Sequence, residues 1–128
     1  MNDRVFVYGT LKRGGSNHGL IAGRYSTVSP AVVLGMLFDL GPFPAAVFRG
    51  NRYLYGEVFE FGDVTAVLPA LDMLEGCPTL YRRIRIPLLD PATLGTSGMG
   101  AWAYEYVNSE SLGQDNLIPS GEWEISRT

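Results

Sequence analysis

The chain has 128 residues, of which 46% are apolar and 18% are charged, and this composition predicts one folded domain over residues 1–128. A net charge of −3 gives no electrostatic basis for binding nucleic acid, and every apolar run is far shorter than the roughly 20 residues that span a bilayer. Cys77 is the only cysteine, so no intrachain disulfide can form. With no leader-like N-terminal segment visible, we expect a cytoplasmic protein.

The first half of the chain is typical of short strands joined by glycine-containing turns. Residues 14–23 are expected to form a loop with one helical turn at 17–21. Gly35 and Gly56 interrupt two of the apolar runs, and Gly35 marks a possible bulge. The predicted strands are 4–8, 31–40 and 53–61, with a short extended piece at 44–48.

A single helix is predicted after Asp63, which is a plausible N-cap. Apolar residues at positions 64, 67, 68, 71 and 74 form one stripe at helical spacing, so Leu68, Leu71 and Leu74 are expected to face the core. An interior proline breaks helices, so we expect an interruption at Pro69 or a helix that starts there. Gly76 then ends the helix.

The second half predicts two further strands, at 81–89 and 100–107, separated by a variable loop at 90–100. Arg83 and Arg85 alternate with isoleucines and indicate a solvated sheet face. Trp102, Tyr104 and Tyr106 share one face of the last strand, and the aromatic tail at 118–123 is expected to pack back on the body. The predicted fold class is α+β, a small mixed β-barrel with one or two flanking helices.

Glu75 is the leading candidate for chemistry. It follows Leu71 by four residues and therefore leans toward the apolar side of the helix. Burial would raise its pKa to about 6–7, which suits a general base at neutral pH. The alternative is a solvated glutamate in the last helical turn. Asp72, on the adjacent face, is expected to have a structural role, such as binding an arginine.

The turn from Tyr8 to Leu11 is a candidate donor site, because successive backbone N–H groups at a strand end can bind a carboxylate or an oxyanion. The alternative is an ordinary turn, and the glycine spacing is not that of a phosphate loop. His18 is the only histidine and Cys77 the only cysteine, so no metal site is predicted. A tyrosine hydroxyl such as that of Tyr104 could reach a pocket.

Together these segments resemble the γ-glutamylcyclotransferase-like family, which includes γ-glutamylamine cyclotransferases and AIG2-like proteins. The opening signature is Val7-Tyr8-Gly9-Thr10-Leu11, with Asn17 and His18 behind it, and a second signature is Leu71-Asp72-Met73-Leu74-Glu75-Gly76. Shorter similar blocks lie at 37–45, 56–59, 81–83, 101–104 and 120–123. The resemblance covers nearly the whole chain in the same order.

The resemblance implies a small mixed β-barrel and an intramolecular cyclisation. The α-amine of a γ-glutamyl-amine or γ-glutamyl dipeptide attacks its own γ-carbonyl, so that pyroglutamate and a free amine form without metal or cofactor. Glu75 would serve as general base and then acid. The choice of leaving amine would lie near 43–46, in the 90–100 loop and in the tail. Substrate binding would fall to Tyr8, Gly9, Thr10, Leu11, Tyr81 and Tyr104.

Two other functions stay open at this point. The chain could be a non-catalytic module that binds a small molecule in the same pocket, because a fold alone does not determine activity. It could also be an enzyme that cleaves another amide in a biosynthetic pathway. The sequence predicts neither the leaving amine nor the oligomeric state.

Overall fold

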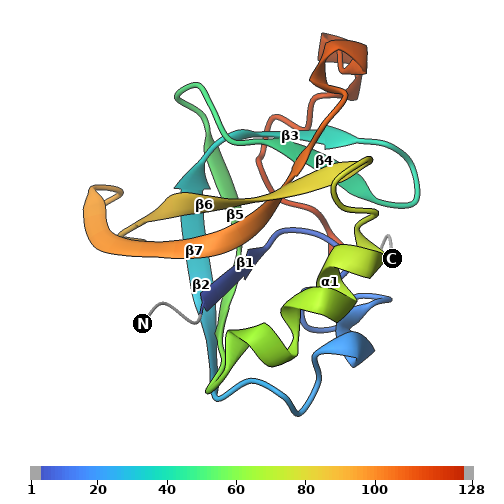
Figure 1. Ribbon diagram of the computed structural model, residues 1–128. Helices are drawn as coiled ribbons and strands as arrows, with labels where there is room; N and C mark the ends of the chain where they lie inside the picture. Colours follow the sequence, from blue (N-terminus) through green and yellow to red (C-terminus); the bar gives the residue numbers. More distant parts are fainter. Residues whose placement is uncertain (1–3, 126–128) are drawn as a thin grey trace.

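The computed structural model describes residues 4–125 and shows a closed five-stranded barrel beside a two-stranded sheet (Figure 1). Residues 1–3 and 126–128 of the predicted domain lie outside the described part. The barrel has the strand order β1-β5-β2-β6-β7, and a parallel bridge between Val5 of β1 and Trp102 of β7 closes it. The barrel strands are β1 (Arg4–Val7), β2 (Thr27–Leu34), β5 (Tyr53–Glu60), β6 (Tyr81–Leu89) and β7 (Thr96–Tyr106). The predicted small mixed barrel is confirmed.

The region predicted as one strand at 31–40 is in fact two strands in two sheets. β2 ends at Leu34, and β3 (Met36–Asp39) pairs with β4 (Pro44–Val47) outside the barrel. Gly35 lies at the crossing, where its N–H donates to the carbonyl oxygen of Arg52 at 3.0 Å. A Cβ atom there would lie 3.0 Å from the carbonyl oxygen of Val47, so glycine allows the close approach of the two sheets.

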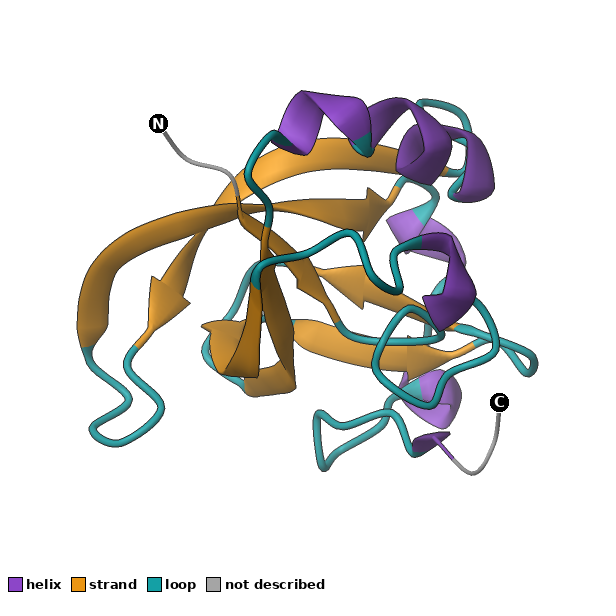
Figure 2. Ribbon diagram, turned by 90° about the horizontal axis from the view of Figure 1, so that it is seen from below, coloured by secondary structure: helices purple, strands orange, loops and turns teal. Residues whose placement is uncertain are grey.

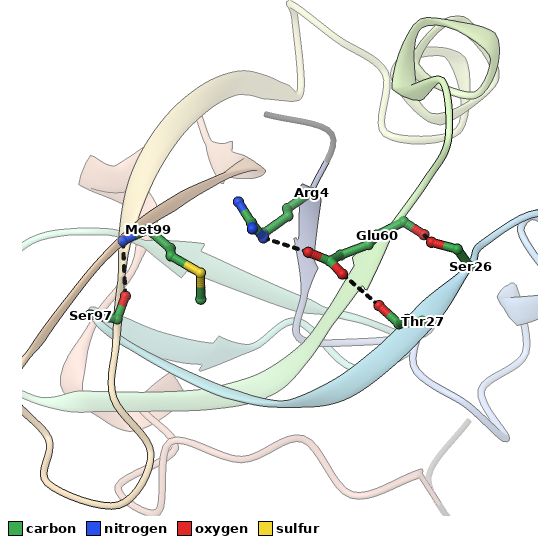
Figure 3. A network of polar contacts seen from close by, with 6 residues as sticks. All are labelled: Arg4, Ser26, Thr27, Glu60, Ser97 and Met99. Atoms are coloured by element: carbon green, nitrogen blue, oxygen red, sulfur yellow. Dashed lines mark hydrogen bonds and ion pairs between the residues drawn. The ribbon is translucent and has the colours of Figure 1, made fainter. Parts of the chain in front are cut away.

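The loop predicted at 90–100 is shorter, because β7 already begins at Thr96. Small residues such as Ser97 and Gly98 have weak strand propensity, which is why this part was predicted as loop. Pairing with β6 compensates, because the Ser97 hydroxyl donates to the carbonyl oxygen of Leu88 at 2.7 Å. Within β7, Met99 N–H donates to Ser97 Oγ at 3.1 Å (Figure 3). Tertiary pairing therefore overrides local preference.

The predicted helix is broken where Pro69 indicated. A 3-10 turn, η2 (Val64–Ala66), precedes α1 (Leu68–Leu74), and Pro69 occupies the first turn of α1, where no N–H partner is lost. Asp63 caps η2 by accepting from Thr65 N–H at 3.1 Å, and Gly76 ends α1 with a φ of +62°. The other short helices are η1 (His18–Leu20), η3 (Ser109–Ser111) and η4 (Gln114–Asn116).

The helical segments lie outside the barrel strands (Figure 2). None of the helices between residues 4 and 125 has the length and hydropathy of a membrane-spanning segment. Val64, Val67, Leu68 and Leu71 are buried, so the apolar stripe of η2 and α1 packs on the barrel as predicted.

Strand β1 is buried on both faces, which explains its uninterrupted apolar sequence. Phe6 and Tyr8 belong to the cluster inside the barrel, together with Trp123 from the tail. Val5 and Val7 belong to a second cluster under η2 and α1. The C-terminal end of β1 therefore lies between the barrel interior and the helix.

Glu60 links three barrel strands at the other end of β1 (Figure 3). Its carboxylate accepts from Thr27 Oγ1 at 2.8 Å and pairs with Arg4 Nε at 2.8 Å. The hydrogen bond from Thr27 lowers the pKa of Glu60, with a smaller contribution from Arg4. Ser26 Oγ donates to the Glu60 carbonyl oxygen at 3.1 Å. These contacts join β1, β2 and β5 at that end.

Candidate functional site

A cavity of about 230 Å³ lies where β1 and α1 both end. It includes all seven residues that the sequence placed at the site: Tyr8, Gly9, Thr10, Leu11, Glu75, Tyr81 and Tyr104. The other residues that line it are Phe6, Val7, Asn17, Phe43, Pro44, Leu74 and Leu80. Two segments more than sixty positions apart in sequence therefore meet at one small cavity.

Glu75 is half-buried and faces this cavity from the C-cap of α1. It follows Leu68 by seven residues, about two helical turns, and so points in nearly the same direction as that core residue. Desolvation by burial raises the pKa of Glu75 from its ordinary value of 4.5 to about 7. No side chain or backbone group of residues 4–125 donates a hydrogen bond to its carboxylate. The carboxyl group of Glu75 can therefore both take up and release a proton near neutral pH.

Leu74 was predicted to face the core, but it does not. Its position, six residues after Leu68, turns it off the buried stripe, and 38% of its surface is exposed at the cavity. The same helical geometry that turns Glu75 inward thus leaves Leu74 at the edge.

Three tyrosines lie around the carboxyl group of Glu75, and the hydroxyl group of each already donates a hydrogen bond to another acceptor. Tyr8 donates to the carbonyl oxygen of Tyr104 at 2.7 Å, and Tyr81 donates to that of Pro44 at 2.7 Å. Tyr104 donates to Asp72 Oδ1 at 2.6 Å. Burial is the main cause that raises the pKa of all three, and the Glu75 charge adds to it. They stay protonated, and only oxygen lone pairs remain to face the cavity.

The turn from Tyr8 to Leu11 also lines the cavity and presents backbone donors. No backbone carbonyl of the described chain accepts from the N–H groups of Gly9, Thr10 or Leu11. A Cβ atom at Gly9 would lie 2.8 Å from Pro44 Cγ and 2.9 Å from Pro44 Cδ, so glycine lets β4 press against the turn. The cavity lining therefore combines three backbone donors with the tyrosine oxygens and the carboxyl group of Glu75.

Two residues of the loop that follows, Asn17 and His18, hold the turn in place, and Asn17 also lines the cavity. Asn17 Nδ2 donates to Thr10 Oγ1 at 2.9 Å, and Asn17 N–H donates to the Thr10 carbonyl oxygen at 2.9 Å. His18 Nδ1 lies 2.9 Å from the Leu11 carbonyl oxygen, which can only accept, so Nδ1 carries the proton. Asn17 and His18 belong to the opening signature, but the sequence assigned them no role.

Two basic residues tie the turn to distant parts of the chain. Lys12 Nζ donates to the carbonyl oxygen of Trp123 at 2.6 Å, and burial lowers the pKa of Lys12. Arg13 makes two bonds to the carboxylate of Glu57 on β5, from its N–H at 2.8 Å and from Nε at 2.9 Å. These supports were missed, because their partners are far away in sequence and their own side chains give no periodic signal.

Asp72 has the structural contact that its position suggested. Besides accepting from Tyr104, it pairs with Arg83 Nε at 3.0 Å. The guanidinium carbons of Arg83 and Arg85 lie 4.8 and 5.0 Å from the centre of the Trp102 ring. The sheet face that was predicted to be solvated therefore carries two arginines stacked on Trp102. Arg83, one of the two, pairs with Asp72, and Asp72 in turn accepts the hydrogen bond of Tyr104.

The predicted pocket wall is only partly right. Phe43 and Pro44 line the cavity, as expected for the 43–46 region. No lining residue comes from 90–100 or from the described part of the tail, which packs instead in the barrel through Trp123. Leu80 takes their place, and no periodic pattern marked it. Among residues 4–125, no three His, Cys, Asp or Glu side chains are grouped so that they could hold a metal ion.

Residues 5–125 match the sequence profile of the family described as gamma-glutamyl cyclotransferase, AIG2-like. The chain belongs to this family. A Vibrio cholerae protein, provisionally named γ-glutamylcyclotransferase, is 37% identical over 128 residues, which cover 96% of each chain. The γ-glutamylaminecyclotransferase of Bos taurus is 35% identical over 96 residues, covering 64% of this chain and 54% of that protein. The crystal structure of Bacillus subtilis YkqA has a TM-score of 0.71 and 30% identity, covering 96% of this chain and 40% of YkqA.

Proposed function

We propose that this chain is a γ-glutamyl cyclotransferase that converts a γ-glutamyl-amine or γ-glutamyl dipeptide to pyroglutamate and a free amine. Glu75 is the general base and then the general acid. The observation that carries the proposal is the desolvated carboxyl of Glu75, with a pKa raised to about 7, in one small cavity with an unpaired donor turn. Membership of the γ-glutamyl cyclotransferase family supports it independently.

The first step is removal of a proton from the substrate. A γ-glutamyl group enters with an α-ammonium, which cannot attack until it is deprotonated. An α-amino group has a pKa of about 8, within roughly one unit of the value for Glu75, so transfer between them costs about 1.4 kcal/mol. A solvated glutamate with its ordinary pKa of 4.5 would be a far weaker base.

The polarity of the cavity orients the substrate for this step. The hydroxyl oxygens of Tyr8, Tyr81 and Tyr104 present acceptors beside Glu75, and this wall suits the α-ammonium. The N–H groups of Gly9, Thr10 and Leu11 suit either the α-carboxylate or the oxyanion of the tetrahedral intermediate. Enclosure of both ends favours the folded conformer in which the amine meets the γ-carbonyl.

The remaining steps need no further group. The neutral amine forms a bond to the γ-carbon, the carbonyl electrons move to oxygen, and the intermediate collapses as the bond to the leaving nitrogen breaks. Protonated Glu75 gives its proton to that nitrogen, which leaves as the amine. The carboxylate restored in this way takes the second proton from the ring nitrogen and passes it to the released amine, so one carboxyl serves as base and acid. All atoms of the substrate appear in pyroglutamate and the released amine, and no water is consumed.

The test is a product assay. The protein is incubated with γ-glutamyl-ε-lysine, γ-glutamyl-n-butylamide and several γ-glutamyl dipeptides, and pyroglutamate is measured by mass spectrometry. Glu75→Gln should abolish turnover, while the control Glu110→Gln, at an exposed glutamate that does not line the cavity, should retain it. Undiminished turnover by Glu75→Gln would exclude Glu75 as the base.

Other outcomes separate the alternatives. Calorimetric binding of a γ-glutamyl compound without any product across the panel would indicate a binding module. Incorporation of oxygen from labelled water into the acyl product at the cleavage step would indicate an amide hydrolase, since cyclisation takes no oxygen from solvent.

A further inference from the structure

We infer that the leaving group this cavity accepts is a small, uncharged, apolar amine. The inference rests on the proposed cyclotransferase function and concerns the part of the substrate that varies. It follows from the apolar side chains at the exposed part of the lining, from the lack of charged partners in the lining, and from the volume of the cavity.

The most exposed part of the lining is apolar. Of the residues that line the cavity, only Leu74 and Leu80 are exposed, at 38% and 42%, so these two side chains are the ones that meet solvent most. Leu80 N–H donates to the Gly76 carbonyl oxygen at 2.8 Å, and a Cβ atom at Gly76 would lie 3.2 Å from Leu80 Cβ. The segment after α1 is thus folded tightly and presents Leu80 beside the helix end. Phe43, half-buried, adds an aromatic ring to the lining.

The lining offers no charge for a charged leaving group. Glu75 is its only ionisable acid, and no Lys, Arg or His lines the cavity. Arg83, which reaches Tyr104 of the lining through Asp72, pairs with that carboxylate at 3.0 Å. A leaving amino acid would bring a carboxylate to the rim formed by Leu74 and Leu80, where no cation of the lining could pair with it. A leaving diamine would bring a second ammonium with no second carboxylate.

Because the cavity is small, we expect the leaving group to lie at the rim formed by Leu74 and Leu80. Its volume of about 230 Å³ is below the roughly 300–1,000 Å³ of pockets that enclose drug-sized ligands. The γ-glutamyl part must lie inside, because its amine has to reach Glu75. Whatever is attached to the γ-carbonyl then extends toward the opening, over Leu74 and Leu80. An alkyl group there buries apolar surface against apolar surface.

The test compares three substrates with the same carbon chain: γ-glutamyl-n-butylamide, γ-glutamyl-norvaline, which adds a carboxylate, and γ-glutamyl-putrescine, which adds an ammonium. We expect kcat/KM to be at least about tenfold higher for the butylamide than for either charged analogue. From methylamide to butylamide it should rise about two- to fourfold per methylene. Equal or faster turnover of norvaline or putrescine compounds overturns the inference but leaves the cyclotransferase function standing. No turnover of any compound overturns the function itself.

A variant at the rim makes the test specific to these side chains. Leu80→Lys places a cation at the opening and should raise turnover of γ-glutamyl-norvaline relative to the butylamide by about tenfold or more. Leu34→Lys is the matched control, because Leu34 has the same exposure of 42% and does not line the cavity. Circular dichroism and thermal melting confirm that both variants fold. An unchanged substrate ratio in Leu80→Lys overturns the assignment of this rim to the leaving group.

Discussion

Replacing Glu75 by glutamine should make the folded protein more stable while it removes activity. The carboxyl is half-buried, accepts no hydrogen bond within residues 4–125, and has its pKa raised to about 7. An amide of the same shape carries no charge to desolvate. The hydroxyl oxygens of Tyr8, Tyr81 and Tyr104 can accept from its N–H groups.

The size of the effect depends on pH in a defined direction. Between pH 4.5 and about 7 the folded state keeps the Glu75 proton, whereas the unfolded chain has released it, so the free energy of unfolding falls as pH rises. The full difference between 4.5 and about 7 corresponds to about 3 kcal/mol, reached above pH 7. Below pH 4.5 both states hold the proton and the penalty vanishes.

The assay is urea unfolding of wild type and Glu75→Gln at pH 4 and pH 8, with Glu110→Gln as the exposed control. We expect the glutamine variant to exceed wild type by up to about 3 kcal/mol at pH 8 and by almost nothing at pH 4, with equal m-values. The control should match wild type at both. A pH-independent difference, or none at pH 8, would refute the desolvation of Glu75 and with it the argument for a base poised near neutrality.

Three further outcomes follow from the site. The kcat/KM of wild type should rise about tenfold per pH unit below pH 7 and level off above it, because Glu75 must be a carboxylate; a flat profile from pH 5 to 8 would contradict this. Gly9→Ala should lower kcat by about 100-fold with the fold retained by circular dichroism, because its Cβ would displace Pro44 or the donor turn, and wild-type rates would disprove the donor role. Trp123→Ala, at a side chain only 1% exposed, should cost about 3–5 kcal/mol in urea unfolding; a loss below about 1 kcal/mol would show that the tail is not part of the core.

The position of Glu75 was predictable because helical periodicity is a local property. Once Leu68 and Leu71 are buried, the 3.6-residue repeat turns position 75 toward them and position 74 away. The misassignment of Leu74 came from reading the stripe by spacing alone, without following its drift around the short helix. The barrel was likewise predictable, since β1 is a clear apolar run and β6 alternates arginines with isoleucines as a strand does.

The directions of the tyrosine hydroxyls were not predictable, because each is determined by a partner remote in sequence. Tyr8 bonds the backbone of β7, and Tyr81 bonds the first residue of β4. The predicted strand boundaries near Gly35 and Thr96 were wrong for the same reason, because pairing between strands determines where these strands end and begin. The anchoring of the donor turn by Glu57 and Trp123 depends on barrel closure, which no local pattern encodes.

The topology explains why the carboxyl meets the donor turn at all. β5 runs antiparallel to β1 and ends at Glu60, opposite Arg4. The chain must then return along the outside of the barrel, which η2 and α1 do (Figure 1). From Arg4 to Tyr8 an extended chain advances about 13 Å. The helical stretch from 64 to 74 covers about 15–18 Å, nearly the same distance. The length of this helical segment, matched to the length of β1, is what delivers Glu75 to the end of that strand.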